Sequence, residues 1–470
     1  MTGVTVLEQD AVGALNRAVA RAAGVPSVPG NRVLPLIDGP ANYAVMHAQI
    51  ASAKRRIHLE NYIINGDATG QAFATALIAK ARDGVKVRVL YDWVGSRGTP
   101  RRFWQQLRDV GIEVMAFGPP SLRDPLLLAS RDHRKVLVVD GARGVTGGLC
   151  IGDEWVGDAA LGRLPWRDTA ISLEGPAAGL LDIAFERAWR FAGGSTIPAG
   201  EVDGDIAEAG GTDVRVVATE PGRERAYRTI ELLLGVSASK IWVTEAYLAA
   251  PQRLYQAFID AARDGVDVRI LVPGASDMPM LRNLARVGYR GLLKAGVRIW
   301  EWQGPMLHAK TIVADGRWVR VGSSNMNASS LLANWELDVF VDDPAMGAAL
   351  EQQFLSDLAT SCEVVRQPRK IPMLFGRELP PALARQHPPL GHNPRHIRSS
   401  RERRRQAMVT AAGLVRGARA AVFGPLALVL LVAAALLVLF PVPAAYTAAT
   451  LGTLMAAALI VRAIGHRGRS

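Results

Sequence analysis

The chain carries the same short pattern, His-x-Lys-x-x-x-x-Asp, at two places far apart in the sequence. The residues that define the two copies are His133, Lys135 and Asp140, and then His308, Lys310 and Asp315. Six residues after each copy comes a turn of small residues, Gly147-Gly148-Leu149-Cys150 in the first and Gly322-Ser323-Ser324-Asn325 in the second. One match is expected by chance in roughly a few per cent of chains this long. Two copies with the same turn at the same offset predict a duplicated domain.

The duplication extends well beyond the motifs. Residues 81–90 read Ala-Arg-Asp-Gly-Val-Lys-Val-Arg-Val-Leu, and residues 262–271 read Ala-Arg-Asp-Gly-Val-Asp-Val-Arg-Ile-Leu. The offset of roughly 175–185 residues is far longer than a solenoid repeat. We therefore expect two homologous lobes, near residues 31–205 and 206–365.

Strand-like and helix-like apolar patterns alternate in the first lobe. The strand-like runs cover residues 56–62, 85–91 and 112–117, and the helical runs cover residues 42–53, 70–82 and 103–110. This succession predicts an α/β fold with a largely parallel sheet in each lobe. Residues 1–30 are expected to form a weakly helical lead-in that Pro26 and Pro29 end.

The basic charge of the chain lies outside the two lobes. Of the net charge of +12, residues 366–419 contribute +11, because they hold 13 Lys and Arg against two acids. Residues 420–470 contribute a further +3, which leaves about −2 for residues 1–365. Residues 366–419 therefore read as a basic, proline-rich connector. The two cysteines, Cys150 and Cys362, fit neither a disulfide framework nor a metal site, which favours a reducing compartment.

Two long uncharged runs follow the connector. Residues 420–440 and 444–461 contain no charged side chain, and Pro441-Val442-Pro443 separates them. At about 1.5 Å per residue the first run is long enough to span the roughly 30 Å hydrocarbon core of a bilayer. Basic residues flank both outer ends, including the tail 462–470, so the positive-inside rule places both ends in the cytoplasm. We expect a transmembrane helical hairpin over residues 420–461.

The paired motifs suit phosphoryl or phosphatidyl transfer. One neutral imidazole can attack phosphorus, while the second protonates the leaving alkoxide and then deprotonates the acceptor. A lysine two residues after each histidine lies on the same strand face and can place positive charge on the phosphate oxygens. This chemistry requires no metal and no other cofactor. Asp140 and Asp315 complete the candidate catalytic set, although each closes an apolar strand and is expected to order a turn.

These motifs resemble those of the HKD phospholipase D superfamily, and within it those of the bacterial cardiolipin synthases. The similarity covers about residues 31–345. Besides the motifs it includes Leu59-Glu60-Asn61-Tyr62-Ile63-Ile64, Val89-Leu90-Tyr91-Asp92-Trp93-Val94-Gly95-Ser96, Gly152-Asp153-Glu154-Trp155, Trp166-Arg167-Asp168-Thr169 and Glu174-Gly175-Pro176. The resemblance implies two α/β lobes whose motifs meet at one pseudo-twofold site, and a phosphohistidine intermediate.

The resemblance also implies roles for individual residues. By position His133 resembles the nucleophile and His308 the acid/base, although the near symmetry makes the order reversible. Asp168 and Glu336 resemble the acids that orient the two imidazoles. The candidate positions around the substrate phosphate are Gly148, Cys150, Ser323 and Asn325. Cys150 is a departure, because the family has Asn there and Cys is a weaker hydrogen-bond donor.

The sequence therefore predicts a phosphatidyltransferase that resembles cardiolipin synthase. Its expected substrates are phospholipids such as phosphatidylglycerol, and its expected location is the cell membrane, with cytoplasmic lobes and a C-terminal two-helix anchor. Three alternatives stay open: a phospholipase D that hydrolyses lipid to phosphatidic acid, a phosphodiesterase or nuclease, and a non-catalytic membrane scaffold. Nucleic acid is not expected as a partner, because its binding favours a basic groove and residues 1–365 are near neutral.

Overall fold

The computed structural model describes residues 3–120, 130–158, 160–198 and 206–365. These residues belong to one compact unit, Met1–Arg366. The expected connector 366–419, the hairpin over 420–461 and the tail 462–470 lie outside the described residues. Within the described part of the chain, no helix is both long and apolar enough to cross a membrane.

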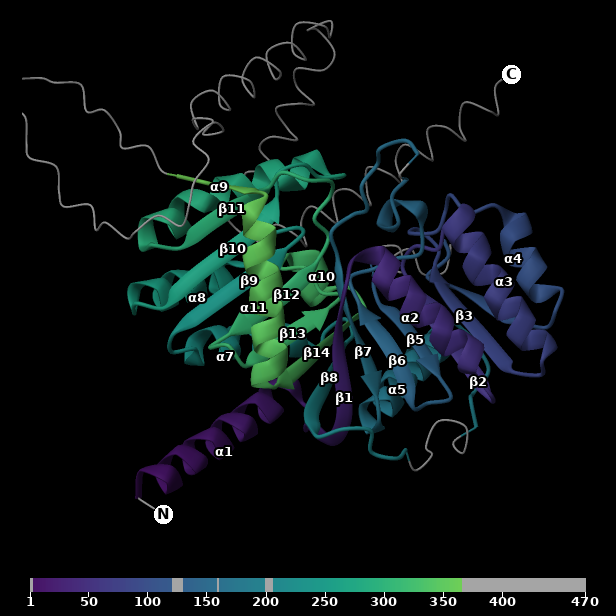
Figure 1. Cartoon of the computed structure of the whole chain (residues 1–470), viewed down its shortest axis with the longest axis horizontal. Helices are drawn as coiled ribbons and strands as arrows, with labels where there is room; N and C mark the ends of the chain where they lie inside the picture. The colour runs from purple at the N-terminus through teal and green to yellow at the C-terminus, as the bar shows by residue number, and fades with distance from the viewer. Residues whose placement is uncertain (1–2, 121–129, 159, 199–205, 366–470) are drawn as a thin grey trace, which may run out of the picture. The chain divides into compact units, whose positions relative to one another are not determined.

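The chain begins with helix α1 (Gly3–Ala23) and then builds a first lobe from alternating strands and helices (Figure 1). The elements of this lobe are β1 (Val28–Ile37), α2 (Asp38–Ser52), β2 (Arg56–Asn61), α3 (Ala68–Arg82), β3 (Lys86–Asp92), α4 (Arg101–Arg108), β4 (Glu113–Phe117), β5 (Lys135–Val139), β6 (Arg143–Gly147), the 3₁₀ turn η2 (Asp153–Trp155), β7 (Thr169–Glu174) and α5 (Pro176–Phe191).

A second lobe repeats this order. Its elements are β8 (Thr212–Thr219), α7 (Arg225–Val236), β9 (Lys240–Glu245), α8 (Gln252–Arg263), β10 (Asp267–Pro273), α9 (Pro279–Ala295), β11 (Arg298–Trp302), β12 (Lys310–Ala314), β13 (Trp318–Gly322), α10 (Ala328–Leu332), β14 (Glu336–Asp342), α11 (Pro344–Ala359) and β15 (Ser361–Glu363). The predicted duplicated α/β fold is therefore confirmed.

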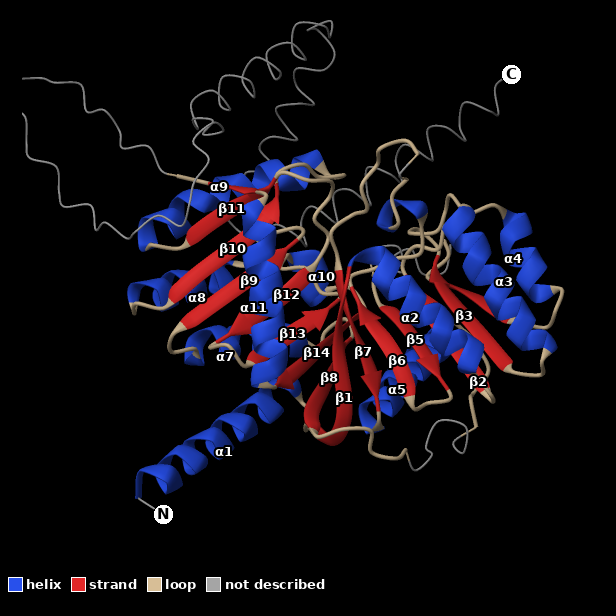
Figure 2. Cartoon of the chain, viewed as in Figure 1, coloured by secondary structure: helices blue, strands red, loops and turns tan. Residues whose placement is uncertain are grey.

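The strands of both lobes join in one sheet with the order β15-β11-β10-β9-β12-β13-β14-β8-β1-β7-β6-β5-β2-β3-β4 (Figure 2). Apart from β15 at one edge, the order is symmetric about the β8–β1 pair, so each motif strand, β5 or β12, occupies the same place in its lobe. Among the strands of the described residues, only β2-β3-β4 and β9-β10-β11 pair in parallel. The expectation of a largely parallel sheet is wrong, because tight turns follow β5 and β12 and such turns can join only antiparallel strands.

Each lobe has an apolar core on both faces of its sheet. Helices α2, α3 and α4 cover the outer face of the first lobe, and α7, α8 and α9 cover the outer face of the second. A third core lies between the lobes and contains Val136 and Val138 of β5 together with Val319 and Val321 of β13. Helices α5 and α11 contribute Leu181 and Leu350 to it. The lobes are therefore held together by a shared apolar layer.

Helix α1 belongs to the second lobe, although it precedes the first in sequence. It packs against α7, and its last residue, Ala23, is fully buried in the second lobe's core. The lead-in predicted over residues 1–30 is thus a helix that ends at Ala23, and β1 begins at Val28.

Arg134, a residue of the first motif, forms hydrogen bonds with both lobes. Its side chain is fully buried, and its guanidinium donates to the carbonyls of Ala184 in α5, Thr219 in β8 and Glu336 in β14 at 3.0–3.2 Å. A buried charge is tolerated only when its donors are paired, and here the acceptors come from both lobes.

We expect Arg134→Met to destabilise the protein by about 3–5 kcal/mol, because it leaves three buried carbonyls without their donor. Chemical denaturation followed by circular dichroism measures the change. Arg32→Met is the matched control, since Arg32 forms an exposed ion pair with Glu174 that contributes about 1 kcal/mol or less. Equal shifts in the two midpoints would contradict the role given to Arg134.

Candidate active site

The two motifs meet where the lobes touch. His133 precedes β5 and His308 precedes β12, and each backbone is held by the opposite lobe. The amide of His133 donates to the carbonyl of Trp335 at 2.9 Å, and the amide of His308 donates to the carbonyl of Arg167 at 2.7 Å. Residues separated by some 140 to 200 positions in the chain are thereby brought into one site.

Each imidazole is also oriented by a carboxylate from the other lobe. Nδ1 of His133 lies 3.0 Å from Oε2 of Glu336, and Nδ1 of His308 lies 2.7 Å from Oδ2 of Asp168. Both carboxylates are fully buried. A carboxylate at Nδ1 holds the proton on that nitrogen, so the lone pair of each ring lies on Nε2.

The two motif lysines lie beside the histidines. Nζ of Lys310 is 2.9 Å from Nε2 of His308, and Nζ of Lys135 donates to the carbonyl of His133 at 2.5 Å. Each ammonium also lies over an aromatic ring, Tyr62 for Lys135 at 5.2 Å and Tyr247 for Lys310 at 5.8 Å. Both lysines are buried. The site thus concentrates positive charge where a phosphate group would be bound.

Burial and mutual charge set the protonation of the site. Burial lowers the pKa of His308 to about 4, with help from the Lys310 charge, and burial also lowers the pKa of His133. Burial alone would raise the pKa of Asp168, but the neighbouring His308 and Lys310 lower it to about 2. Burial lowers the pKa of Lys310 to about 8, and Lys135 adds to the effect. At neutral pH the imidazoles are neutral and the lysine beside His308 is charged.

Asp140 and Asp315 are not at this site. Each sits at the far end of its strand with a left-handed backbone, φ 54° and 49°. Asp140 accepts the amides of residues 54–56, and Asp315 accepts those of residues 238–240, at 2.7–3.0 Å. These two members of the candidate catalytic set therefore bind backbone amides at turns and do not contact the imidazoles. They order the turns that precede β2 and β9, as their place after an apolar strand indicated.

The turns after the motifs support the carboxylates. A Cβ at Gly148 would lie 2.1 Å from Oδ1 of Asp168, so only glycine leaves room for that carboxylate. In the second lobe Ser323 replaces this glycine, and its hydroxyl donates to Glu336 at 2.5 Å. The side-chain amide oxygen of Asn325 is buried and has no hydrogen-bond donor among the described residues. Cys150 is 1% exposed in the first core, and burial raises the pKa of its thiol.

Several site residues were not singled out from the sequence. The indole of Trp155 donates to Asp168 at 2.9 Å, and the rings of Trp155 and Trp166 lie 5.7 and 5.9 Å from the His308 ring. Tyr62 lies 4.8 Å from the His133 ring. The Ser330 hydroxyl donates to Glu336. Their contacts join positions that no local pattern connects, so only the family-like runs around residues 62, 155 and 166 gave a signal.

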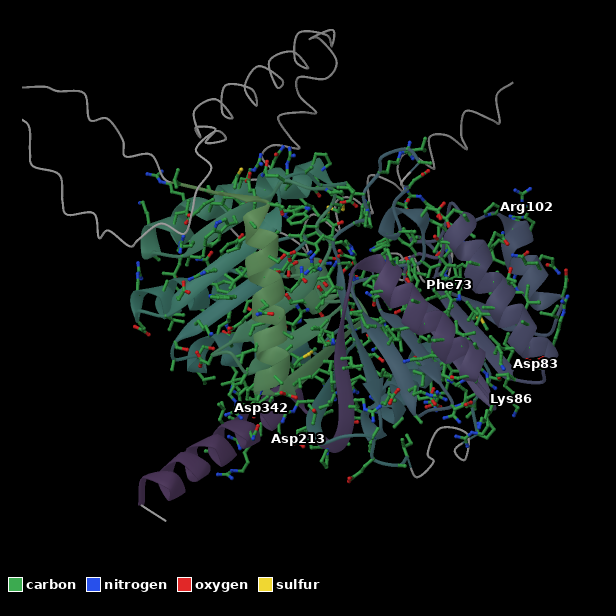
Figure 3. The ribbon with its side chains drawn as sticks, in the orientation of Figure 1. Phe73, Asp83, Lys86, Arg102, Asp213 and Asp342 are labelled. Atoms are coloured by element: carbon green, nitrogen blue, oxygen red, sulfur yellow. The ribbon has the colours of Figure 1, made fainter. Side chains whose placement is uncertain are left out.

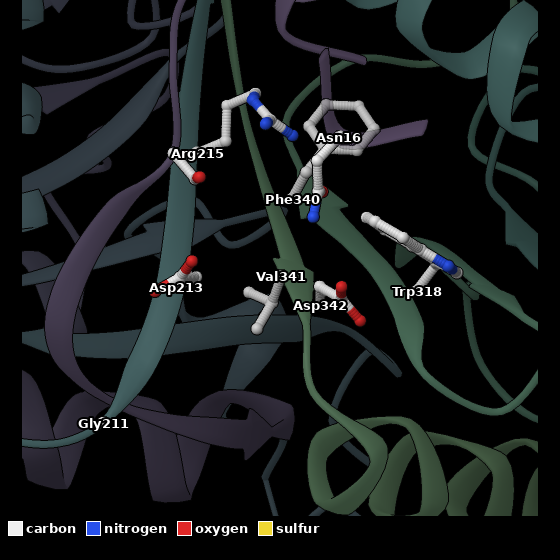
Figure 4. A pocket seen from close by; sticks show the side chains of 9 residues that line it. Asn16, Gly211, Asp213, Arg215, Trp318, Phe340, Val341 and Asp342 are labelled. Atoms are coloured by element: carbon white, nitrogen blue, oxygen red, sulfur yellow. The ribbon is translucent and has the colours of Figure 1, made fainter. Parts of the chain in front are cut away.

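A separate cavity of about 130 Å³ lies away from the motifs (Figure 4). Asn16 of α1, Arg215 of β8 and Phe340 of β14 line it, with Asp213 and Asp342 at its edge. Figure 3 places these two aspartates together beside α1. Asp342 ends the strand that Glu336 begins, about 20 Å along a strand of this length. The cavity therefore contributes nothing to the chemistry of the histidines.

Comparison with known proteins gives a consistent result. The family profile described as "Cardiolipin synthase, PLD-like domain" matches residues 46–153 and 231–358. A cardiolipin synthase of Geobacillus sp. (strain WCH70) is 34% identical over 69% of this chain and 65% of its own length. Cardiolipin synthase A of Pseudomonas entomophila (strain L48) is 30% identical over 77% of this chain and 76% of its own length. The chain thus spans slightly less than two thirds of the Geobacillus protein.

The fold is shared with solved structures. Phosphatidylserine synthase from Haemophilus influenzae Rd KW20 superimposes with a TM-score of 0.57 and 15% sequence identity. The match covers 74% of this chain and 92% of that one. It supports the duplicated α/β architecture independently of close sequence similarity.

Asp168→Asn is expected to lower the turnover rate by about 10²- to 10⁴-fold, because an amide no longer fixes the tautomer of His308. Initial rates of phosphodiester transfer or hydrolysis measure this loss. Asp140→Asn is the matched control: the chemical change is the same, and asparagine tolerates the left-handed backbone at that turn. Similar losses in the two variants would contradict the distinction between them.

The pH dependence of kcat/KM should show an alkaline limb near pH 8. Lys310 is charged below its pKa of about 8 and loses its charge as the pH rises through that value. The buried carboxylate of Glu245 raises this pKa by attraction. Glu245→Gln should therefore move the limb to lower pH, whereas Glu351→Gln, on a residue paired with the distant Lys240, should not. A limb that does not move in Glu245→Gln would refute the assignment to Lys310.

Proposed function

The chain belongs to the cardiolipin synthase group of phospholipase D-like proteins, and on that premise we propose that it is a phosphatidyltransferase that moves a phosphatidyl group between phospholipids. The observation that carries the proposal is that each histidine is held at Nδ1 by a carboxylate from the opposite lobe. This supplies two Nε2 lone pairs that face one site, beside two buried ammonium groups. That arrangement suits a phosphodiester whose phosphorus is attacked and whose leaving oxygen must be protonated.

His133 is proposed as the nucleophile. Within the described part of the chain, its Nε2 has no hydrogen-bond partner, whereas Nε2 of His308 faces Lys310 at 2.9 Å. In the first step a bond forms between this nitrogen and phosphorus, and the bond from phosphorus to the leaving head-group oxygen breaks. The anionic phosphate raises the pKa of His308, so that its Nε2 takes up a proton from solvent when the substrate binds, and His308 then gives this proton to the leaving oxygen. Lys135 and Lys310 neutralise charge on the phosphate oxygens.

In the second step the roles reverse. His308 takes the proton of an acceptor hydroxyl, the acceptor oxygen bonds to phosphorus, and the bond to His133 breaks. An acceptor that is a lipid head-group hydroxyl, as in phosphatidylglycerol, gives cardiolipin. Water as acceptor gives phosphatidic acid. The relatives named cardiolipin synthase favour the lipid acceptor.

The remaining part of the chain is proposed to hold the enzyme at its substrate. Residues 420–461 would form a two-helix membrane anchor, with the lobes 31–205 and 206–365 in the cytoplasm. The basic connector 366–419 would lie near anionic lipids, at about 1 kcal/mol for each Lys or Arg at the surface. Its 13 basic residues support this placement.

Expression of the full chain in bacterial cells that lack cardiolipin should restore cardiolipin, as measured by mass spectrometry of extracted lipids. His133→Ala should restore none at an equal protein level. Accumulation of phosphatidic acid without cardiolipin would show that the enzyme hydrolyses phospholipid and does not transfer the phosphatidyl group to a second lipid. Unchanged lipids, with abundant folded protein, would overturn the proposal.

A phosphate-labelled donor lipid should give a covalent adduct on His133. His133→Ala should abolish it, whereas His308→Ala should form it slowly and then retain it, because no residue deprotonates the acceptor. An alkaline detergent quench followed by peptide mapping locates the label, because the P–N bond of phosphohistidine is lost in acid more readily than in base. Label found on His308 in the His133→Ala variant would reverse the two roles.

A further inference from the structure

Helix α9 presents an apolar face that the rest of the described structure does not cover. Met280, Leu284 and Val287 follow the i, i+4, i+7 spacing of one helix face and are 77%, 49% and 76% exposed. Ala285, Tyr289 and Leu292 form the opposite face and are buried in the second lobe's core. The helix therefore buries one apolar face and leaves a second one in contact with solvent, at the periphery of its lobe beside β11 (Figure 1).

The same helix carries cations and no acidic residue. Its sequence holds Arg282, Arg286, Arg290 and Lys294. Arg286 is paired with Glu301 at 2.8 and 2.9 Å. Arg290 and Lys294 are exposed, and they continue the apolar face by helical spacing towards the C-terminal end. One exposed face is thus apolar in its first half and cationic in its second.

A second exposed apolar group lies on the loop that leaves the first lobe after η2. Val156, Leu161 and Leu164 are exposed on it, the last two by 64% and 69%. Trp155 and Trp166 bracket this loop, and both rings contact His308. The exposed side chains therefore lie within a few residues of the catalytic centre.

The start of α9 is tied to the same centre. Asp277, two residues before the helix, accepts a hydrogen bond from the Tyr247 hydroxyl at 2.8 Å, and the Tyr247 ring lies 6.0 Å from that of His308. His133 and His308 themselves are only 9% and 6% exposed. The exposed apolar side chains of α9 and of the loop after η2 thus come from both lobes, and both segments are connected to the surroundings of His308.

We infer that α9 and the loop after η2 form a docking surface for a bilayer that contains anionic phospholipid. The inference rests on the proposed function, and it names where the bilayer meets the enzyme. Met280, Leu284, Val287, Leu161 and Leu164 enter the interfacial layer, and Arg290 and Lys294 contact lipid phosphates. Charge complementarity selects this occupant, because an interfacial helix combines an apolar face with cations and few acids. The phosphodiester is then delivered without leaving the bilayer.

A fluorescent reporter on α9 tests the contact directly. An environment-sensitive dye is attached to Val287→Cys in the full chain carrying Cys362→Ser, and the protein is reconstituted in vesicles of phosphatidylcholine and phosphatidylglycerol. Val236→Cys is the matched control: it is also an exposed valine, but it ends α7, which packs on the far side of α8 from α9. We expect bromine-labelled acyl chains to quench the dye at position 287 and not at position 236.

Two other outcomes of the quenching experiment would overturn the inference. A dye at position 287 that is shielded in detergent and insensitive to bromine-labelled lipid would show that protein covers α9, either residues 366–470 or a second copy, and would overturn the inference. A dye that stays fully hydrated in vesicles would also overturn it. Quenching is independent of catalysis, so it decides the docking even if the lipid-transfer assay fails.

Kinetics supply a second readout. The combined change Met280→Ser, Leu284→Ser and Val287→Ser should raise the KM for vesicle substrate by about tenfold or more, because the apolar contribution to interfacial binding is lost. The rate on a dispersed short-chain phospholipid should be unchanged, as should both rates in Val236→Ser. Equal loss on the two substrates would indicate damage to the fold and contradict the docking role.

Discussion

The site depends on two hydrogen bonds between the lobes, in which a carboxylate of each lobe holds the catalytic histidine of the other. Each histidine is supplied by one lobe and its orienting acid by the other, through contacts of 2.7 and 3.0 Å. A single lobe would hold a histidine with no fixed tautomer and a buried carboxylate with no partner, which is costly in an apolar interior. The shared core of β5, β13, α5 and α11 is therefore a requirement of the chemistry as much as of stability. Duplication gives a complete site only because the copies face each other.

The two halves are related but not equivalent. Glu336 receives the hydroxyls of Ser323 and Ser330, whereas Asp168 receives an indole N–H from Trp155 and lies against Gly148. His308 is bordered by two tryptophans and bonded to its own lysine, while Nε2 of His133 has no hydrogen-bond partner among the residues that the structure describes. These differences separate two imidazoles that the motif alone makes equal. They give a physical basis for one acting as nucleophile and the other as acid and base.

The sequence predicted the features that repeat or alternate locally. The paired motifs, the repeated run at residues 81–90 and the alternation of strands and helices led to a duplicated α/β fold, and α1 ended close to where Pro26 required. It did not predict the sheet pairing, because turn geometry after β5 and β12 decides direction while the periodicity of a strand does not. The aromatic contacts around His308 also escaped prediction, since they join residues that are distant in sequence. The resemblance supplied Asp168 and Glu336, whose partners no spacing rule could identify.

The two motifs also differ in the residues on either side of the histidine, which are charged in the first motif and apolar in the second. Asp132 and Arg134 flank His133, while Leu307 and Ala309 flank His308. Asp132 and Glu60 are both fully buried, and burial raises the pKa of Asp132 to about 7. Burial also raises the pKa of Glu60, and the Asp132 charge adds to the effect, so the two carboxyl groups are not both ionised at neutral pH. With Arg134 beside Glu60 at 3.8 Å, the group is close to neutral overall. The buried charges next to His133, the nucleophile of the proposed reaction, therefore nearly cancel. Its reactivity is then set by Glu336 and the lysines.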